Sequence, residues 1–291
     1  MSGHPTPTCG RIFSAWLELF RLPNLFTVPG DILVGWMAGG AAGGLPLRAI
    51  AISLALYSVG LLLNDLFDLP IDRRERPQRP LPSGRVRPWQ VLLLTGGLTT
   101  LALCLSAAAR PTALTLLGLI LFYDALAKRI PVLGVLTMGA CRGVNILLGT
   151  ALCWPQGLPF AWPPTALAAA IFFATYILLV SIVAKHEAEP DVRIGDLLRW
   201  FPVAMTLGLE ALWWLSGHGL SWWPPMACLP LILLLLIRRP VPAFVAGLIR
   251  HLIWLQLLWL LPHQAITDPL SLALLACWGA ALLSGRFFAG S

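Results

Sequence analysis

The chain has 291 residues, of which 58% are hydrophobic and only 11% are charged. Soluble domains carry roughly 25% charged residues, so a soluble globular protein of this composition would expose large apolar patches. The formal net charge is +7, but the basic residues are spread over short loops without interleaved aromatics, which argues against a nucleic-acid partner. The composition therefore indicates an integral membrane protein whose cations meet anionic lipid or phosphorylated ligands.

Apolar stretches that suit membrane helices, about 20 residues each, begin near residue 22 and continue along the chain. The predicted segments are about 22–42, 47–68, 89–108, 112–127, 132–152, 164–184, 198–216, 222–237, 241–261 and 269–288. Pro and Gly mark most of the breaks between them. We expect an all-α, multi-pass bundle of about nine to ten helices. Residues 1–20 would form a short cytoplasmic tail and residues 21–291 a single transmembrane domain.

The loops between these segments alternate in charge. Loop 70–88 holds six arginines, and 185–199 and 238–240 are also basic, whereas 153–163 and 217–221 contain no Lys or Arg. Because cytoplasmic loops of membrane proteins carry an excess of Lys and Arg, both termini and the basic loops are expected in the cytoplasm.

Eight of the thirteen acidic residues fall into two clusters at predicted cytoplasmic helix ends. The first reads Asn64-Asp65-Leu-Phe-Asp68-Leu-Pro-Ile-Asp72. On a helix these four polar side chains span an arc of about 100°, although Pro70 is expected to loosen the helix before Asp72. Three like charges on one face repel unless a cation binds them, and such oxygen ligands suit Mg²⁺ with phosphate oxygens. A solvated acidic loop paired with neighbouring arginines is the alternative.

Sequence motifs around this cluster resemble the UbiA superfamily of intramembrane prenyltransferases. The first cluster and the following Arg79-Pro80-Leu81-Pro82-Ser83-Gly84-Arg85 are similar to the family's signature. Arg21-Leu-Pro23-Asn24-Leu25 resembles the start of the family's first helix, and the stretch from Tyr123 to Pro131 the end of its fourth. The resemblance covers roughly residues 20–262.

Two further features indicate a divergent branch of that family. The segment 269–288 adds a tenth helix to the nine usual in the family. The combination of Asn24-Leu-Phe-Thr-Val-Pro29-Gly-Asp31 with Arg142-Gly-Val-Asn145 resembles the UbiA-like members of ebo-type bacterial gene clusters. This narrower resemblance adds no acceptor.

The resemblance implies a helix bundle around a central cavity that opens to the cytoplasmic side of the bacterial inner membrane. It implies Mg²⁺-dependent transfer of an isoprenoid chain from an allylic diphosphate to a small, aromatic or lipophilic acceptor. Asp65, Asp68 and Asp72 would form the catalytic acidic set, with the first two as metal ligands, and Asn64 would orient the metal shell.

The family's second acidic motif, commonly DxxxD, is altered in this chain. Alignment through Gly195 places Glu187 on its first Asp and Asp191 on its last. Two carboxylates one turn apart still suit a metal, so both are expected as ligands. Pro190 lies between them and should break a continuous helix, which would change the geometry of this second site.

Cations beside the acidic cluster are candidates for contact with the diphosphate. Lys128 and Arg79 lie on loops of the same predicted side, where positive-inside topology alone would also place them. Asn24 and Tyr123 are further candidates for substrate binding. Tyr123 could stabilise a cation through its ring, or could lie at the membrane interface.

Polar residues inside the fifth segment are also candidates for substrate binding. Arg142 and Asn145 lie three positions apart in an apolar stretch, where an unpaired Arg is costly. Arg142 could bind diphosphate, pair with an acid such as Asp124 or Asp31, or reach the interface. Asp31 could serve the acceptor or form a buried pair.

Prenyl transfer is the leading hypothesis, and two others stay open. A terpene cyclase of the same family would ionise the same diphosphate but close the chain on itself. A non-catalytic lipid-binding or transport component would keep the fold without needing the carboxylates. The acceptor, the chain length and the oligomeric state are not fixed by the sequence.

Overall fold

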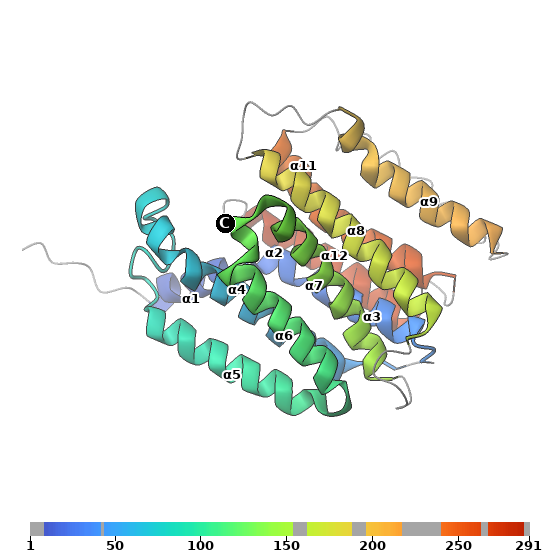
Figure 1. Cartoon of the computed structure of the whole chain (residues 1–291), viewed down its shortest axis with the longest axis horizontal. Helices are drawn as coiled ribbons and strands as arrows, with labels where there is room; N and C mark the ends of the chain where they lie inside the picture. The colour runs from blue at the N-terminus through green and yellow to red at the C-terminus, as the bar shows by residue number, and fades with distance from the viewer. Residues whose placement is uncertain are drawn as a thin grey trace, which may run out of the picture.

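The computed structural model describes residues 9–41, 44–153, 162–187, 196–216, 240–262 and 267–287, and this part of the chain is helical throughout its regular structure (Figure 1). The α-helices are α1 (Cys9–Leu19), α2 (Leu22–Leu25), α3 (Val28–Ala38), α4 (Leu47–Glu75), α5 (Pro88–Ser106), α6 (Arg110–Ala125), α7 (Pro131–Ala151), α8 (Pro164–Glu187), α9 (Phe201–Leu215), α11 (Val241–Leu260) and α12 (Pro269–Phe287). Short 3₁₀ turns occupy 107–109, 127–129 and 196–200.

Proline sets the start of many of these helices. Its missing N–H costs nothing in the first turn, where backbone donors have no helical partner, and its fixed φ suits the helix. The prolines in first-turn positions are Pro23, Pro29, Pro88, Pro111, Pro131, Pro202 and Pro242. Among the described residues, the predicted breaks at Pro111 and Pro131 are therefore real helix starts.

Five described helices are long and apolar enough to cross a bilayer: α4, α5, α7, α8 and α11. Helices α3, α6 and α9 have only 11, 16 and 15 residues, fewer than the about 20 of a full span. The predicted segment 222–237 lies outside the described residues. The prediction of an all-α, multi-pass membrane protein is confirmed.

Two predicted segments differ from the helices that form. The segment 22–42 is broken into α2 and α3, because Pro29 lacks the N–H that would bond the carbonyl of Leu25. Conversely, α4 does not loosen at Pro70 but continues to Glu75. Leu66 and Leu69, just before the proline, pack against the cluster around Leu62, and this packing keeps the helix continuous despite the missing hydrogen bond.

Glycine allows α7 to approach its neighbours closely. A Cβ on Gly149 would lie 2.5 Å from the carbonyl oxygen of Ile32 in α3, and one on Gly139 2.7 Å from that of Ala174 in α8. Small residues at helix contacts let membrane helices associate through close backbone packing. Helix α7 therefore forms the centre of the bundle, with α3 and α8 on either side (Figure 1).

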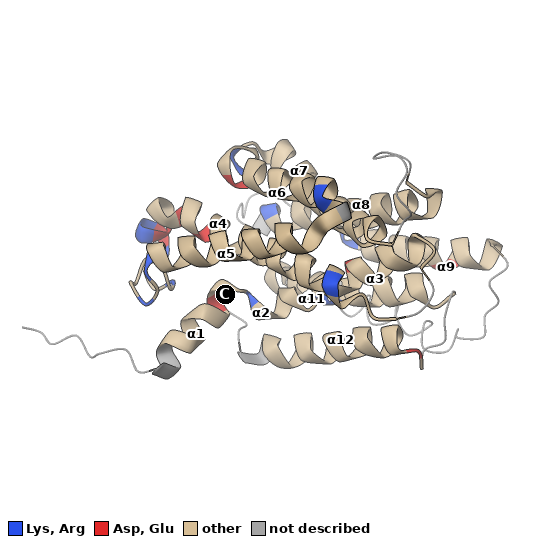
Figure 2. Ribbon diagram, turned by 90° about the horizontal axis from the view of Figure 1, so that it is seen from below, with Lys and Arg blue, Asp and Glu red and all other residues tan. Residues whose placement is uncertain are grey.

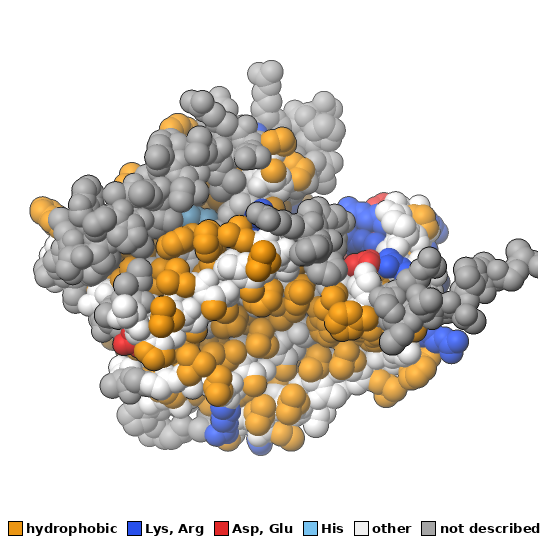
Figure 3. Space-filling model, turned by 180° about the vertical axis from the view of Figure 1, so that it is seen from behind, with side chains coloured by type: hydrophobic (Ala, Val, Ile, Leu, Met, Phe, Trp, Pro, Cys, Tyr) orange, Lys and Arg blue, Asp and Glu red, His pale blue; other side chains and the backbone are white. Residues whose placement is uncertain are grey.

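Apolar side chains cover the outer faces of the bundle. Leu93, Ile171 and Leu215 are 68%, 66% and 75% exposed, and Figure 3 shows hydrophobic side chains over much of the described surface seen from behind. Such faces are stable against lipid tails and would be a liability in water. With the five spanning helices, they identify an integral membrane protein.

The two ends of the described chain pack onto this bundle. The expected N-terminal tail contains α1, whose Ala15 and Leu19 are buried beside Leu62 of α4 and Val86 of the following loop. At the other end, α12 packs on α11 and α2 and lies beneath them in Figure 2.

Candidate functional site

The final turns of α4 carry the first acidic cluster, and acidic and basic residues gather there in Figure 2. Each of its three carboxylates meets a cation from a different part of the chain. The shortest nitrogen–oxygen distances are 3.3 Å for Arg21–Asp65, 2.6 Å for Lys128–Asp68 and 2.8 Å for Arg79–Asp72. These one-to-one pairs relieve the repulsion expected for three acids on one helix face.

Arg21 reaches the cluster from the turn between α1 and α2. Its backbone has φ 43°, in the left-handed region, which costs a non-glycine residue about 1–2 kcal/mol. Residues held in such conformations concentrate at functional sites, where the surrounding structure enforces them. No role for Arg21 was predicted from the sequence, although this residue begins the motif that contains Asn24.

The motif from Arg79 to Arg85 forms a loop that is fastened to α1. Arg85 makes a bidentate pair with Glu18, with both nitrogen–oxygen distances 2.8 Å. Ser83 Oγ donates to the Arg79 carbonyl at 2.6 Å, and Gly84 takes φ 75°, which suits glycine. Leu81 is buried. The loop is thereby held in the form that directs Arg79 at Asp72.

Lys128 joins α4 to the end of α6. Its Nζ lies 2.6 Å from Asp68, 3.3 Å from the Asn64 side-chain oxygen and 3.7 Å from Asp124. Asp124 is 1% exposed, and its Oδ1 has no hydrogen-bond partner among the described residues. Burial of a carboxylate whose Oδ1 has only this long ion pair is costly, and Asp124 shares its cation with Asp68, so Asp124 belongs to the site. In the sequence, the spacing of four residues between Asp124 and Lys128 indicates that the two side chains can pair on one helix face.

A second polar network lies deeper, between α3, α7 and α11. The Nε of Arg142 lies 2.8 Å from Asp31 Oδ2, and its two other nitrogens donate to the carbonyl and hydroxyl of Thr27. Asn145 Nδ2 and Gln256 Nε2 each donate to the Asp31 carboxylate at 2.8 Å. Of the alternatives for Arg142, the structure selects the pair with Asp31.

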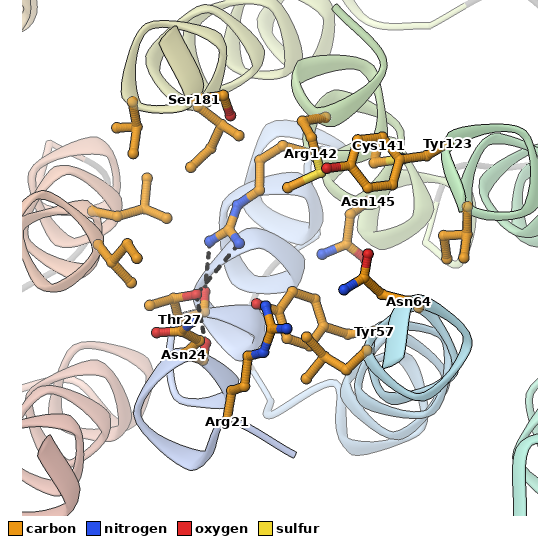
Figure 4. Close-up of a pocket in the computed structure, with 18 of the residues that line it drawn as sticks. Arg21, Asn24, Thr27, Tyr57, Asn64, Tyr123, Cys141, Arg142, Asn145 and Ser181 are labelled. Atoms are coloured by element: carbon orange, nitrogen blue, oxygen red, sulfur yellow. Dashed lines mark hydrogen bonds between the residues drawn. The ribbon is translucent and has the colours of Figure 1, made fainter. Parts of the chain in front are cut away.

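A pocket of about 410 Å³ runs between these two polar regions. Figure 4 shows its polar residues, which come from α4, α6, α7, α8 and the segment from Arg21 to Thr27. The polar lining residues are Arg21, Asn24, Thr27, Ser53, Tyr57, Asn64, Tyr123, Asp124, Arg142, Asn145 and Ser181. The rest of the lining is mostly apolar, including Leu61, Leu116 and Ile120.

The predicted site residues divide into three groups. Asn24, Asn64, Tyr123, Arg142 and Asn145 line the pocket. A second group forms the paired row beside it: Asp65, Asp68, Asp72, Arg79 and Lys128. The predicted ligands from the second motif are outside what the structure describes: Asp191 entirely, and the side chain of Glu187, the last residue of α8.

The first cluster fits Mg²⁺ by the type of its donors. Asp65, Asp68 and the Asn64 amide offer only oxygen atoms, which hard cations prefer. Within the described part of the chain, no three His, Cys, Asp or Glu side chains converge as a metal-binding group. A complete metal shell therefore needs oxygens from elsewhere, such as a diphosphate or the second motif.

Comparisons with known proteins agree with this architecture. The sequence profile of the UbiA prenyltransferase family matches residues 25–274. The chain is 30% identical over 172 residues to digeranylgeranylglyceryl phosphate synthase from Methanoculleus marisnigri, covering 56% of this chain and 59% of that protein. It is 29% identical over 256 residues to the mitochondrial 4-hydroxybenzoate polyprenyltransferase of Saccharomyces cerevisiae, covering 75% and 66%.

A solved structure shows the same fold. The apo structure of a UbiA homolog from Aeropyrum pernix K1 superimposes with a TM-score of 0.61 at 16% identity, covering 90% of this chain and 98% of that one.

Proposed function

Since this chain belongs to the UbiA prenyltransferase family, we propose that it transfers an isoprenoid chain from an allylic diphosphate to a lipophilic acceptor within the membrane. The observation that carries the proposal is the row of three carboxylate–cation pairs on α4, next to a largely apolar pocket. A diphosphate needs both a metal and cations, and an isoprenoid needs apolar walls. The site offers carboxylates suited to a metal, cations and apolar walls in adjoining places.

Its basic residues would receive the diphosphate. Arg21, Lys128 and Arg79 now neutralise carboxylates that are suited to a metal. Once those carboxylates are engaged, the same three cations are free to donate to phosphate oxygens. Mg²⁺ bound by Asp65 and Asp68, with Glu187 and Asp191, would neutralise charge on the departing diphosphate. Asn64 would direct its side-chain oxygen toward the ligands of this Mg²⁺.

The pocket walls would protect the allylic cation that ionisation leaves. Leu61, Leu116 and Ile120 exclude water, which limits hydrolysis. Tyr123 presents a ring to the pocket, where its π-face can stabilise the cation. Asn24, Arg142 and Asn145 would then contact the acceptor. The relatives' names place a glyceryl phosphate and a 4-hydroxybenzoate among the molecules handled in this family.

We infer that the acidic row faces the cytoplasm of a bacterial cell, in its inner membrane. The six arginines of loop 70–88 support this orientation under the positive-inside rule. Both termini would then be cytoplasmic as well.

The test uses purified protein in lipid nanodiscs with Mg²⁺ and allylic diphosphates of several chain lengths. Diphosphate release and organic products are followed with and without phenolic and lipid acceptors. We expect acceptor-dependent prenylated product that Asp65→Asn/Asp68→Asn abolishes. The matched control is Glu75→Gln, because Glu75 is an exposed acid at the end of the same helix.

Other products would change the conclusion. Cyclic terpenes formed without acceptor, and lost in the double variant, would identify a cyclase. Release that is absent with every diphosphate and acceptor, or equal in the double variant, would reject catalysis and favour a lipid-binding component.

A further inference from the structure

The inner end of the pocket is electrically neutral even though an arginine lines it. Arg142 lies on the pocket wall, and its guanidinium is 2.8 Å from the carboxylate of Asp31, which is fully buried behind that wall. Figure 4 shows Arg142 turned toward Thr27 and away from the Asn64 side. One positive and one negative charge therefore cancel at this place.

This pair differs from the pairs on α4 in how firmly it is held. The side chains of Arg21 and Arg79 are 30% and 26% exposed, so water can solvate them when a ligand separates them from their acids. The side chains of Arg142 and Asp31 are only 9% and 0% exposed. Separating a buried pair leaves two unsolvated charges, so Arg142 stays with Asp31 when a substrate binds.

Two further residues fix the negative partner in place. Gln256 Nε2 donates to one oxygen of Asp31 and Asn145 Nδ2 to the other. Asn145 in turn accepts from Ser53 of α4 at 2.6 Å. The carboxylate thus has donors on both oxygens and stays ionised beside Arg142, so the pair offers no net positive charge to offset the desolvation of an incoming anion.

Hydrogen-bonding groups are nevertheless available at this end. A guanidinium has five N–H donors on three nitrogens. Each guanidinium nitrogen of Arg142 makes one contact with Asp31 or Thr27, so N–H groups remain for a ligand. The hydroxyl-bearing Tyr57 lines the same region. Tyr57 precedes Asp65 by eight residues, about 12 Å along the helix axis, which leaves room for a diphosphate and a small acceptor.

We propose that the acceptor bound between Arg142 and Tyr57 is an uncharged molecule with a hydrogen-bonding oxygen, such as a phenol, hydroquinone or alcohol. This inference rests on the proposed prenyl transfer and specifies its acceptor class. It sets the chain apart from relatives named for 4-hydroxybenzoate and a glyceryl phosphate, because a carboxylate or phosphate would be buried here without a net counter-charge.

A matched pair of probes separates charge from shape. Methyl 4-hydroxybenzoate and 4-hydroxybenzoate present the same phenol, and only the acid carries a negative charge at neutral pH. Each is supplied with geranylgeranyl diphosphate and Mg²⁺ to protein in nanodiscs, and the prenylated products are quantified. We expect the ester to be the better acceptor by at least about tenfold, the size of one charge-assisted contact.

Variants remove the effect of unequal partitioning of the probes into lipid. Asp31→Asn frees the charge of Arg142 and should shift the ester-to-acid ratio toward the acid by about tenfold. The double variant Asp31→Asn/Arg142→Gln has no charge at the inner end of the pocket, so it should keep the wild-type preference for the ester. Because partitioning is the same for all three proteins, a change in the ratio reports the site.

Each outcome decides the inference. An acid that equals or exceeds the ester in the wild type, or a ratio that Asp31→Asn leaves unchanged, overturns it while prenyl transfer stands. If wild-type protein shows neither prenyl transfer nor diphosphate release that depends on Asp65, the proposed function is rejected instead.

A second measurement covers the case in which neither probe is prenylated or Asp31→Asn does not fold. The two probes are then compared as inhibitors of the Asp65-dependent diphosphate release by wild-type protein. Stronger inhibition by the ester supports the inference; equal, weaker or no inhibition overturns it.

Discussion

Lys128 is the residue whose contacts connect the acidic row with the end of α6. Its ammonium group contacts Asp68, Asn64 and Asp124, so it is the cation best placed to pass to a diphosphate. We expect Lys128→Gln to lower kcat/KM for the diphosphate by about 10- to 100-fold, because hydrogen bonds to charged groups contribute about 1.5–3 kcal/mol. Steady-state kinetics of diphosphate release measure this.

The control for Lys128 is a cation at the opposite end of α4. Arg48 is exposed and donates to the carbonyl of Leu105, so Arg48→Gln should keep wild-type kcat/KM. A Lys128→Gln protein as active as wild type would show that its contacts serve folding alone.

The buried pair Arg142–Asp31 makes a prediction about stability. Arg142→Gln leaves a buried carboxylate without its cation, which should cost about 3–5 kcal/mol. Adding Asp31→Asn should recover about 2 kcal/mol, since both charges are then absent. Unfolding of the single and double variants in mild detergent measures this coupling. Simple additivity of the two substitutions would mean that the pair does not interact as its 2.8 Å separation indicates.

Sequence reasoning found the local parts of the site and missed the distant ones. The helical spacing of Asp65, Asp68 and Asp72 follows from the chain itself. Gln256, however, contacts Asp31 across 225 positions, and nothing in an apolar stretch such as 241–261 marks one amide as a partner. Arg21 was overlooked as well, because its direction depends on a left-handed backbone turn.

At the scale of helices, the contact between α3 and α7 is the most sensitive to side-chain size. A Cβ on Gly149 would lie 2.5 Å from the backbone oxygen of Ile32, and backbone cannot yield as a flexible side chain can. Gly149→Ala should therefore destabilise the protein by about 1–3 kcal/mol. Because Asp31 and Arg142 belong to these same two helices, activity should fall with it. Thermal unfolding and prenyl transfer are measured together.

Gly96 in α5 is the matched control, since no atom lies within 4 Å of a Cβ placed there. Gly96→Ala should be neutral or stabilise by up to about 1 kcal/mol, because alanine favours the helix. Equal effects of the two substitutions would contradict the close packing of α3 and α7.

Helix positions were predictable from the sequence, and their continuity was not. Apolar length and first-turn prolines located most segments, because both act within one element. Whether a helix breaks, as between α2 and α3, or continues, as α4 does at Pro70, depends on its packing against other parts of the chain. Leu66 and Leu69 pack against the hydrophobic cluster that contains Leu62 and Val86, and this stabilisation is not part of local helix propensity.

For the molecule as a whole, the charge asymmetry of the loops predicts its orientation. Leu45 and Ser83 are exposed residues beyond opposite ends of α4. In a background without native cysteines, Ser83→Cys should react with a membrane-impermeant thiol reagent only in inside-out vesicles. Leu45→Cys should react only in right-side-out vesicles. The reverse pattern would place the acidic row on the outer side and refute the assigned orientation.

The length of α4 has a consequence for how a substrate arrives. Its 29 residues extend about 44 Å, beyond the roughly 30 Å of the hydrocarbon layer. Asp65 lies eighteen residues after Leu47, about 27 Å along the axis. If α4 enters the hydrocarbon layer at Leu47, the acidic row therefore reaches the lipid headgroups on the other side. A prenyl diphosphate is an amphiphile anchored at that depth, so under the proposed function it would reach the row by lateral diffusion. Under the proposed function, turnover therefore follows the mole fraction of substrate in the bilayer and falls when inert lipid dilutes it.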